Sequence, residues 1–170
     1  MKKLVSTLIL VFALAIVASA QVNLQVSGFA VTNNPAGTQE FGYGLGGGYR
    51  YEKLYLGLDV FSDPSKTNPK QPARGRAFAT WDLYDWNGLK LSAGGGGWKT
   101  GNETGGFGHV GVQFRRFSAI GRYGNQQFAE AEGAFEAIKA ERFAVGPFYR
   151  YTRTGNFQTL QQAGLRLTLR

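Results

Sequence analysis

The single histidine of this chain, His109, is the first residue to consider for catalysis. A histidine beside a serine or an aspartate can act as general base for a nucleophile. Ser92 lies on a neighbouring predicted strand, and Asp63 and Ser65 lie in a loop expected on the same side. The alternative is that His109 is a hydrogen-bonded interior residue with a structural role and takes part in no reaction. We therefore expect no catalytic residue, and a hydrolase or acyltransferase using His109 at the rim is the minor alternative.

Three glutamates, Glu130, Glu132 and Glu136, fall at even positions of one segment and so project to the same side of a strand. Neighbouring carboxylates can divide acid–base work in an active site. Arginines accompany them along the chain, among them Arg122 and Arg150. Enclosed carboxylates require such partners, so we expect a structural charge network and no acid–base pair.

Cofactor, metal and nucleic-acid binding are not expected. The chain has no cysteine and one histidine, which excludes a thiolate or histidine-rich metal site. Four glycines at 94–97 are not followed by the Lys-Ser/Thr of a phosphate-binding loop. The net charge of +8 could attract nucleic acid, but the basic residues are dispersed, with no run of five or more.

The first twenty residues have the layout of a cleaved signal peptide. Two lysines precede an apolar run over residues 4–17, and small residues follow at 18–20. An uncleaved membrane anchor would need about 20 apolar residues, more than this run supplies. We expect cleavage after Ala20, which leaves one domain over residues 21–170. Because Lys2 and Lys3 leave with residues 1–20, the net charge falls to +6.

The rest of the chain alternates between apolar and polar residues with a period of two. Near its end, Leu165, Leu167 and Leu169 point one way, while Arg166 and Arg170 point the other. A helix, with 3.6 residues per turn, would scatter the arginines around the apolar stripe. The pattern therefore predicts strands, and their lengths suit a tilted bilayer crossing of about 9–11 residues.

Ten strands are predicted, and their connections differ between the two ends. The strands span residues 22–31, 40–51, 53–61, 75–86, 88–98, 107–115, 117–123, 127–138, 142–152 and 157–170. Eight strands is the alternative if the short seventh strand is misread. Tight turns are expected at 51–53, 85–88, 115–116 and 139–141, and longer loops at 32–38, 62–73 and 99–106. Short turns at one end and longer loops at the other are typical of outer-membrane barrels.

Sorting the strands by parity gives one uncharged apolar wall and one charged wall. Tyrosine and phenylalanine on the apolar wall gather near strand ends, as aromatic girdles do at membrane interfaces. The charged wall predicts an interior network of Arg50, Asp59, Arg76, Asp82, Lys90, Arg122, Glu130, Glu132, Glu136, Arg142, Arg150 and Arg166. Aromatic residues expected to fill the remaining lumen are Phe29, Tyr55, Phe78, Tyr84 and Phe148.

Periodicity does not decide whether the apolar wall faces lipid or the lumen of a soluble, lipocalin-type barrel. Simple hairpin registers place Glu130 opposite Arg150 and Asp82 opposite Lys90, as enclosed charges require. Glycines on the charged wall make room for side chains in a narrow lumen. With the aromatic strand ends, these features favour an all-β fold: a closed antiparallel up-and-down transmembrane β-barrel.

The last strand carries a polar residue and a glycine ahead of spaced apolar residues, at Gln162, Gly164, Leu167 and Leu169. This stretch resembles the assembly signal of outer-membrane barrels, although it has leucine where aromatics are common and ends in arginine. With the signal peptide and the strand rhythm, the whole mature chain resembles the small outer-membrane β-barrel proteins of bacteria. The resemblance implies location in the bacterial outer membrane, with outer-membrane lipid and the barrel-assembly machinery as partners.

For function, we expect a non-enzymatic integral outer-membrane protein that supports the envelope or interacts at the surface, as a monomer. A surplus of interior arginine over acids, with inward glycines, leaves a narrow, weakly anion-preferring pore as one alternative. A secreted, soluble, lipocalin-like barrel that binds an apolar ligand is the other.

Overall fold

The computed structural model describes residues 22–33, 39–62, 74–100, 103–125, 128–153 and 159–170. The predicted signal peptide, residues 1–20, lies outside them. The strands are β1 (Val22–Asn33), β2 (Gln39–Tyr51), β3 (Leu54–Phe61), β4 (Arg74–Trp86), β5 (Leu89–Thr100), β6 (Glu103–Phe114), β7 (Phe117–Gly124), β8 (Ala129–Phe135), β9 (Ile138–Lys139), β10 (Phe143–Arg153) and β11 (Thr159–Leu169). None of the described residues forms a helix long and apolar enough to cross a membrane.

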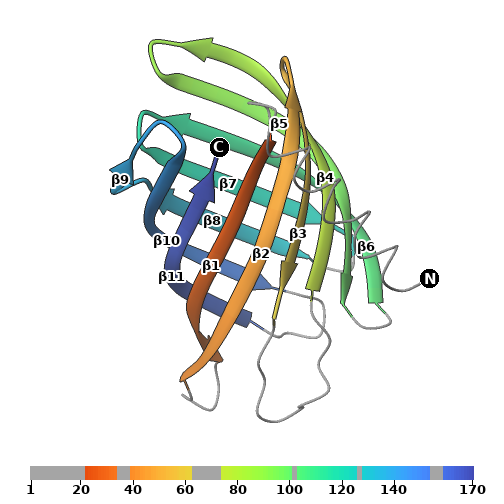
Figure 1. Cartoon of the computed structure of the whole chain (residues 1–170). Coiled ribbons are helices and arrows are strands. Elements are labelled where there is room, and N and C mark those ends of the chain that lie inside the picture. The colour runs from red at the N-terminus through yellow and green to blue at the C-terminus, as the bar shows by residue number, and fades with distance from the viewer. Residues whose placement is uncertain (1–21, 34–38, 63–73, 101–102, 126–127, 154–158) are drawn as a thin grey trace, which may run out of the picture.

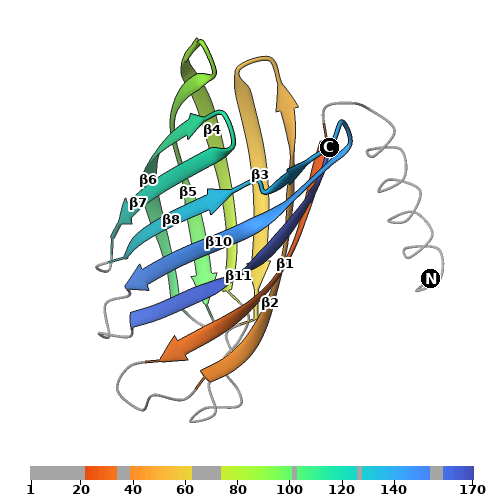
Figure 2. The ribbon, with the colours of Figure 1, turned by 90° about the vertical axis from the view of Figure 1, so that its left-hand side faces the viewer.

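The strands close into a ring in which each pairs antiparallel with its neighbours (Figures 1 and 2). The order runs from β1 through β8 to β10 and β11, and β11 pairs with both β10 and β1. The two-residue β9 pairs with β10 beyond the end of β8. β8 and β9 therefore take the place of one strand, and the barrel has ten strands. The ten-strand prediction is confirmed, and the eight-strand alternative is wrong.

Tight turns join strands at one end, called the turn end here. The turn between β4 and β5 has Asn87 at φ 48° and Gly88 at φ 81°. Two successive residues with positive φ suit the twist of a two-residue hairpin. Glu52 and Arg115 also have positive φ, in the turns after β2 and β6. At the other end, called the loop end, β5 continues to Thr100 and β6 begins at Glu103. The prediction of a long loop over 99–106 is therefore wrong.

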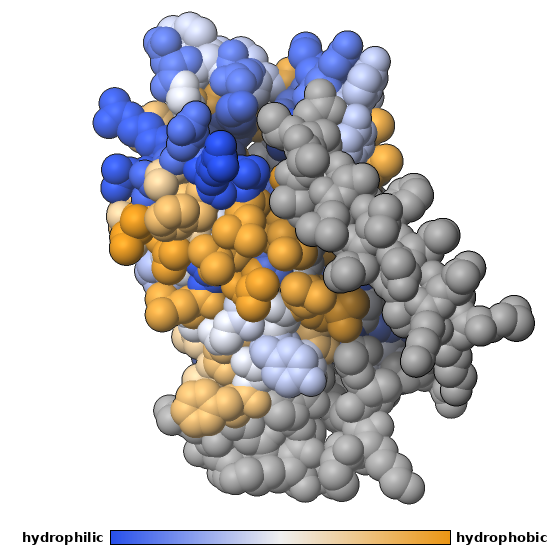
Figure 3. All heavy atoms as spheres, in the orientation of Figure 1, coloured by the Kyte–Doolittle hydropathy of each residue, from blue (hydrophilic) through white to orange (hydrophobic). Residues whose placement is uncertain are grey.

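The outer wall is apolar, as parity predicts. Phe41, Tyr43 and Tyr123 are 84%, 73% and 76% exposed, and Leu165 on the last strand is 61% exposed. A band of apolar side chains crosses the face shown in Figure 3, below charged residues of the turn end. Charged and bulky aromatic side chains at the alternate positions are buried in the lumen.

One aromatic residue predicted for the lumen lies outside it. The pairing of β4 with β5 shifts between Asp82 and Tyr84, so that Tyr84 lies opposite Leu91 on the outer wall. A β-bulge adds one residue to a strand, and a shift of one residue reverses which face each later side chain takes. Tyr84 is accordingly 47% exposed, whereas Phe29 and Phe148 are buried as predicted.

Candidate functional site

Two buried glutamates of β8 form the centre of a charge cluster in the loop-end half of the lumen. Glu130 and Glu132 are 5% and 7% exposed, and their alternate positions on the strand turn both inward. Their partners come from four other strands. These are Arg76 on β4, Arg122 on β7, Arg150 and Thr152 on β10, and Arg166 on β11. Asp59 on β3 joins the cluster through its ion pair with Arg76.

Glu130 bonds to groups from three sides. Its Oε1 accepts hydrogen bonds from Arg122 Nη1, at 2.5 Å, and from Arg76 Nη1. Its Oε2 accepts one from Thr152 Oγ1 at 3.1 Å. Arg76 donates in turn to Asp59 Oδ2 at 2.8 Å. Strands far apart in the chain are therefore tied through one carboxylate.

Glu132 forms the second centre. Its Oε2 accepts from Arg150 Nε at 2.7 Å, and its Oε1 lies 2.7 Å from Arg166 Nη2. Arg150 also donates to Gln162 Oε1 at 3.3 Å. Charge-assisted hydrogen bonds of this kind are about twice as strong as neutral ones. Every carboxylate oxygen of the two glutamates is thus within bonding distance of a described side chain.

Aromatic rings support the arginines from the lumen. The guanidinium carbons of Arg76 and Arg150 lie 4.7 Å and 4.1 Å from the ring centroid of Phe61. That of Arg166 lies 4.6 Å from the centroid of Phe148. A cation over an aromatic face gains further attraction, more so when it is shielded from water. Phe61 lies two residues after Asp59, so the parity that identified the charges would also have identified this ring.

The predicted cross-strand ion pairs are shifted. Arg150 lies opposite Glu132, and Glu130 lies opposite Thr152. Lys90 lies opposite Asp85, while Asp82 lies opposite Ser92 and pairs with Arg50. Both predicted registers are wrong because of the position of the turns, although Arg150 Nε still lies 3.8 Å from Glu130 Oε1. The β4–β5 turn centres on Asn87-Gly88, where positive φ is accommodated, and the hairpin between β9 and β10 turns after Ala140. The expected partners therefore lie two or three residues off.

The other predicted network residues lie toward the turn end and outside the cluster. Lys90 Nζ pairs with Asp85 at 2.9 Å, both well exposed. Glu136 pairs with Lys139 at 3.4 Å and with Arg170. Arg142 is exposed between β9 and β10, where its backbone carbonyl accepts a hydrogen bond from Arg170 N at 2.9 Å.

His109 is placed as an interior residue. Its Nε2 lies 2.8 Å from Thr80 Oγ1, and its ring packs at 5.8 Å from Phe78 and 6.1 Å from Phe107. Asp63 and Ser65, considered as its partners, lie outside the described residues. Across the described chain, no group of three His, Cys, Asp or Glu residues is placed to hold a metal.

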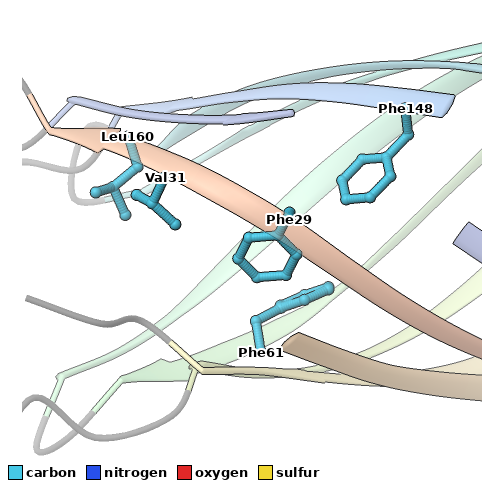
Figure 4. Packing of buried hydrophobic residues seen from close by; sticks show 5 residues of the cluster. All are labelled: Phe29, Val31, Phe61, Phe148 and Leu160. Carbon is cyan, nitrogen blue, oxygen red and sulfur yellow. The ribbon is translucent and has the colours of Figure 1, made fainter. Parts of the chain in front are cut away.

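The lumen is hollow toward the turn end and filled toward the loop end. Cavities of about 540 and 230 Å³ share Asn23, Gln25, Arg50 and Arg166 in their linings, so they form one space running in from the turn end. The charge cluster lines the inner part of this space through Asp59, Arg122, Glu132 and Arg150, and two hydrophobic clusters flank it. One consists of Phe29, Val31, Phe61, Phe148 and Leu160 (Figure 4), the other of Trp98, Phe107 and Phe128.

The residues of the signal-like ending also have places in the barrel. Gln162 is buried and accepts the hydrogen bond from Arg150. Gly164 faces Phe29 so closely that a Cβ there would collide with the backbone and side chain of that residue. Leu167 and Leu169 lie on the outer wall, 36% and 42% exposed.

Comparison with known proteins yields structural neighbours alone. No family model matches the chain, and no curated protein matches it. Among solved structures, Neisserial surface protein A (NspA) aligns over 87% of this chain and 94% of its own, at 13% identity and a TM-score of 0.44. Ail, the attachment invasion locus protein of Yersinia pestis, aligns over 88% of this chain and 95% of its own, at 9% identity and a TM-score of 0.38.

Proposed function

We propose that this chain is a non-enzymatic integral protein of the bacterial outer membrane, with a barrel that is closed to solutes and supports the envelope or interacts at the surface. The observation that carries the proposal is the division of the barrel into an apolar exterior and a lumen that holds the buried ion pairs. An apolar exterior of this extent is not expected for a protein in water, because large contiguous apolar patches are rare on soluble monomers.

Lipid suits both the exterior and the closed ring. Within a bilayer each backbone N–H and C=O needs a partner, so a sheet can cross only without free edges. The pairing of β11 with β1 removes the edge. Export through a signal peptide over residues 1–20, and insertion by the barrel-assembly machinery acting on the last strand, belong to this proposal. A lumen lined by ion pairs does not suit the apolar ligand of a lipocalin-like barrel.

Membrane fractionation tests the location. We expect the protein to stay in the outer-membrane fraction after alkaline carbonate washing, and to migrate differently on gels before and after boiling because a closed barrel resists detergent. Release into the soluble fraction without detergent would contradict the proposal.

A narrow pore is the second candidate, favoured by the continuous cavity at the turn end and by the one-charge excess of arginine in the cluster. Against it, arginines and aromatic rings fill the loop-end half of the lumen. Planar-bilayer recording separates the two. We expect no conductance through the bilayer. Discrete conductance steps that change on replacement of Arg122 or Arg150 would establish the pore.

A further inference from the structure

An apolar groove runs down the outer wall over β6, β7, β8 and β10, the strands that face the viewer in Figure 2. It consists of three hollows of about 470, 700 and 650 Å³. The first two share Val112, Ala119, Gly133 and Tyr149, and the last two share Val110, Gly121, Ala131 and Tyr151. The hollows are therefore continuous along the strands.

The floor of the groove has almost no side chains. Ala119 lies opposite Gly133, and Gly121 lies opposite Ala131. A Cβ added at Gly121 or Gly133 would meet nothing within 4 Å. Exposed valines of β6 form one side, Val110 at 65% and Val112 at 42% exposure. Tyr149 and Tyr151 of β10 form the other, at 48% and 37%. The shape suits a flexible hydrocarbon chain lying along the strands.

Two arginines lie at the turn end of this groove. The guanidinium of Arg115 is 5.2 Å from the ring of Phe114, which itself lines the groove. Arg116 Nη1 donates to the carbonyl of Ala137 at 3.3 Å, across the end of β8. Both arginines are exposed. They thus lie where a lipid headgroup would be if its acyl chain followed the groove.

The charge of the rim is positive on this side alone. The two turns above the groove hold four cations, Arg115, Arg116, Lys139 and Arg142, against Glu136 and Glu141. Glu136 is already paired with Lys139 and Arg170. The two turns on the other side balance, with Glu52 and Asp85 against Lys53 and Lys90. An anion is therefore attracted to the turn after β6 and not to the rim as a whole.

We propose that this groove binds one anionic phospholipid, with an acyl chain along Ala119, Gly121, Ala131 and Gly133 and the phosphate at Arg115 and Arg116. The inference rests on the membrane insertion proposed above. Guanidinium groups recognise phosphate through paired N–H donors, and aromatic rings at the interface hold the neighbouring glycerol region. Arg115 and Arg116 belong to a tight turn, so the lipid belongs to the leaflet at the turn end.

Native mass spectrometry of the folded full-length barrel tests the site. The barrel is mixed with equal amounts of phosphatidylglycerol and phosphatidylcholine in detergent, and the ratio of the two retained lipids is measured. We expect phosphatidylglycerol to be retained preferentially. R115Q/R116Q should lower that preference about five-fold for each charge removed near an anionic surface. K53Q, on the balanced side of the same rim, is the matched control and should leave the ratio unchanged.

Filling the groove separates the acyl chain from the charge. G121L/G133L places side chains in open space and should reduce retention of both lipids. G28L is its control, because Gly28 is an exposed glycine of β1 with nothing within 4 Å of an added Cβ. Boiling-dependent gel migration confirms that each variant is folded.

Three outcomes would overturn the inference: an unchanged ratio in R115Q/R116Q, an equal loss in K53Q, or a dimer of the barrel that disappears in G121L/G133L. The last would assign the groove to a second copy. A barrel that inserts into bilayers but shows no lipid preference contradicts this inference alone. A barrel that does not insert contradicts the proposed function.

Discussion

The two halves of the lumen are lined by inward-facing residues of the same strands, but side chains fill only one of them. Toward the loop end, Glu130 and Glu132 join arginines from four strands between two hydrophobic clusters. Toward the turn end, inward positions such as Asn23, Gln25 and Ser118 leave a cavity of about 540 Å³. Barrel closure is a property of the backbone pairing and holds in both halves. Lumen filling depends on residue size and is needed in one half to block passage.

The largest effect on stability is expected at Glu130, in the filled half. Replacing it with glutamine, Glu130→Gln, leaves Arg76 and Arg122 without their shared charge in a buried site. Breaking a buried ion pair on one side costs about 3–5 kcal/mol. We expect a loss of that size in the free energy of unfolding, measured by urea titration in detergent micelles. Asp85→Asn, at the exposed rim, is the control and should change it by less than about 1 kcal/mol.

A smaller effect is expected from crowding the filled half. In Gly164→Ala the new methyl group meets the backbone of Gly28 and Phe29, and forced overpacking costs about 1–3 kcal/mol. Gly28→Ala places the same group in open space on the outer wall and should be neutral. Equal unfolding midpoints for the two variants would show that the loop-end half is not tightly packed.

Removing an ion pair from the hollow half should matter less still. Arg50 pairs with Asp82, but its side chain is 44% exposed at the edge of the cavity. Solvent screening limits such pairs to about 0–1 kcal/mol. Arg50→Ala is expected to fall within that range in the same urea titration. A loss comparable to that of Glu130→Gln would erase the distinction between the halves.

The smallest effect is expected from adding bulk to the hollow half. Ser118 lines the 540 Å³ cavity, so the ring of Ser118→Phe has space to enter it. A change within about 0.5 kcal/mol is expected, as for substitutions that disturb no packed contact. Strong destabilisation would mean that the cavity is narrower than its volume indicates.

Strand positions and the identity of the two walls followed from sequence because they depend on local alternation. Leu165, Leu167 and Leu169 face outward and Arg166 inward, as their parity requires. Glu130, Glu132, Arg122 and Arg150 were recognised as interior charges for the same reason. These features need no knowledge of which strand lies beside which.

The partners of each charge depend on how whole strands lie against one another. One extra residue at the β4 bulge turned Tyr84 outward, and the placement of the turns put Glu132, in place of Glu130, opposite Arg150. Arg76 reaches Glu130 across the lumen, 54 residues away in sequence, which no hairpin register predicts. Parity is local, so it assigns side chains to the lumen or to the outer wall along a regular strand, but not beyond a bulge such as the one before Tyr84. Which of them meet depended on bulges, turns and ring closure, because those set the relative shift of whole strands.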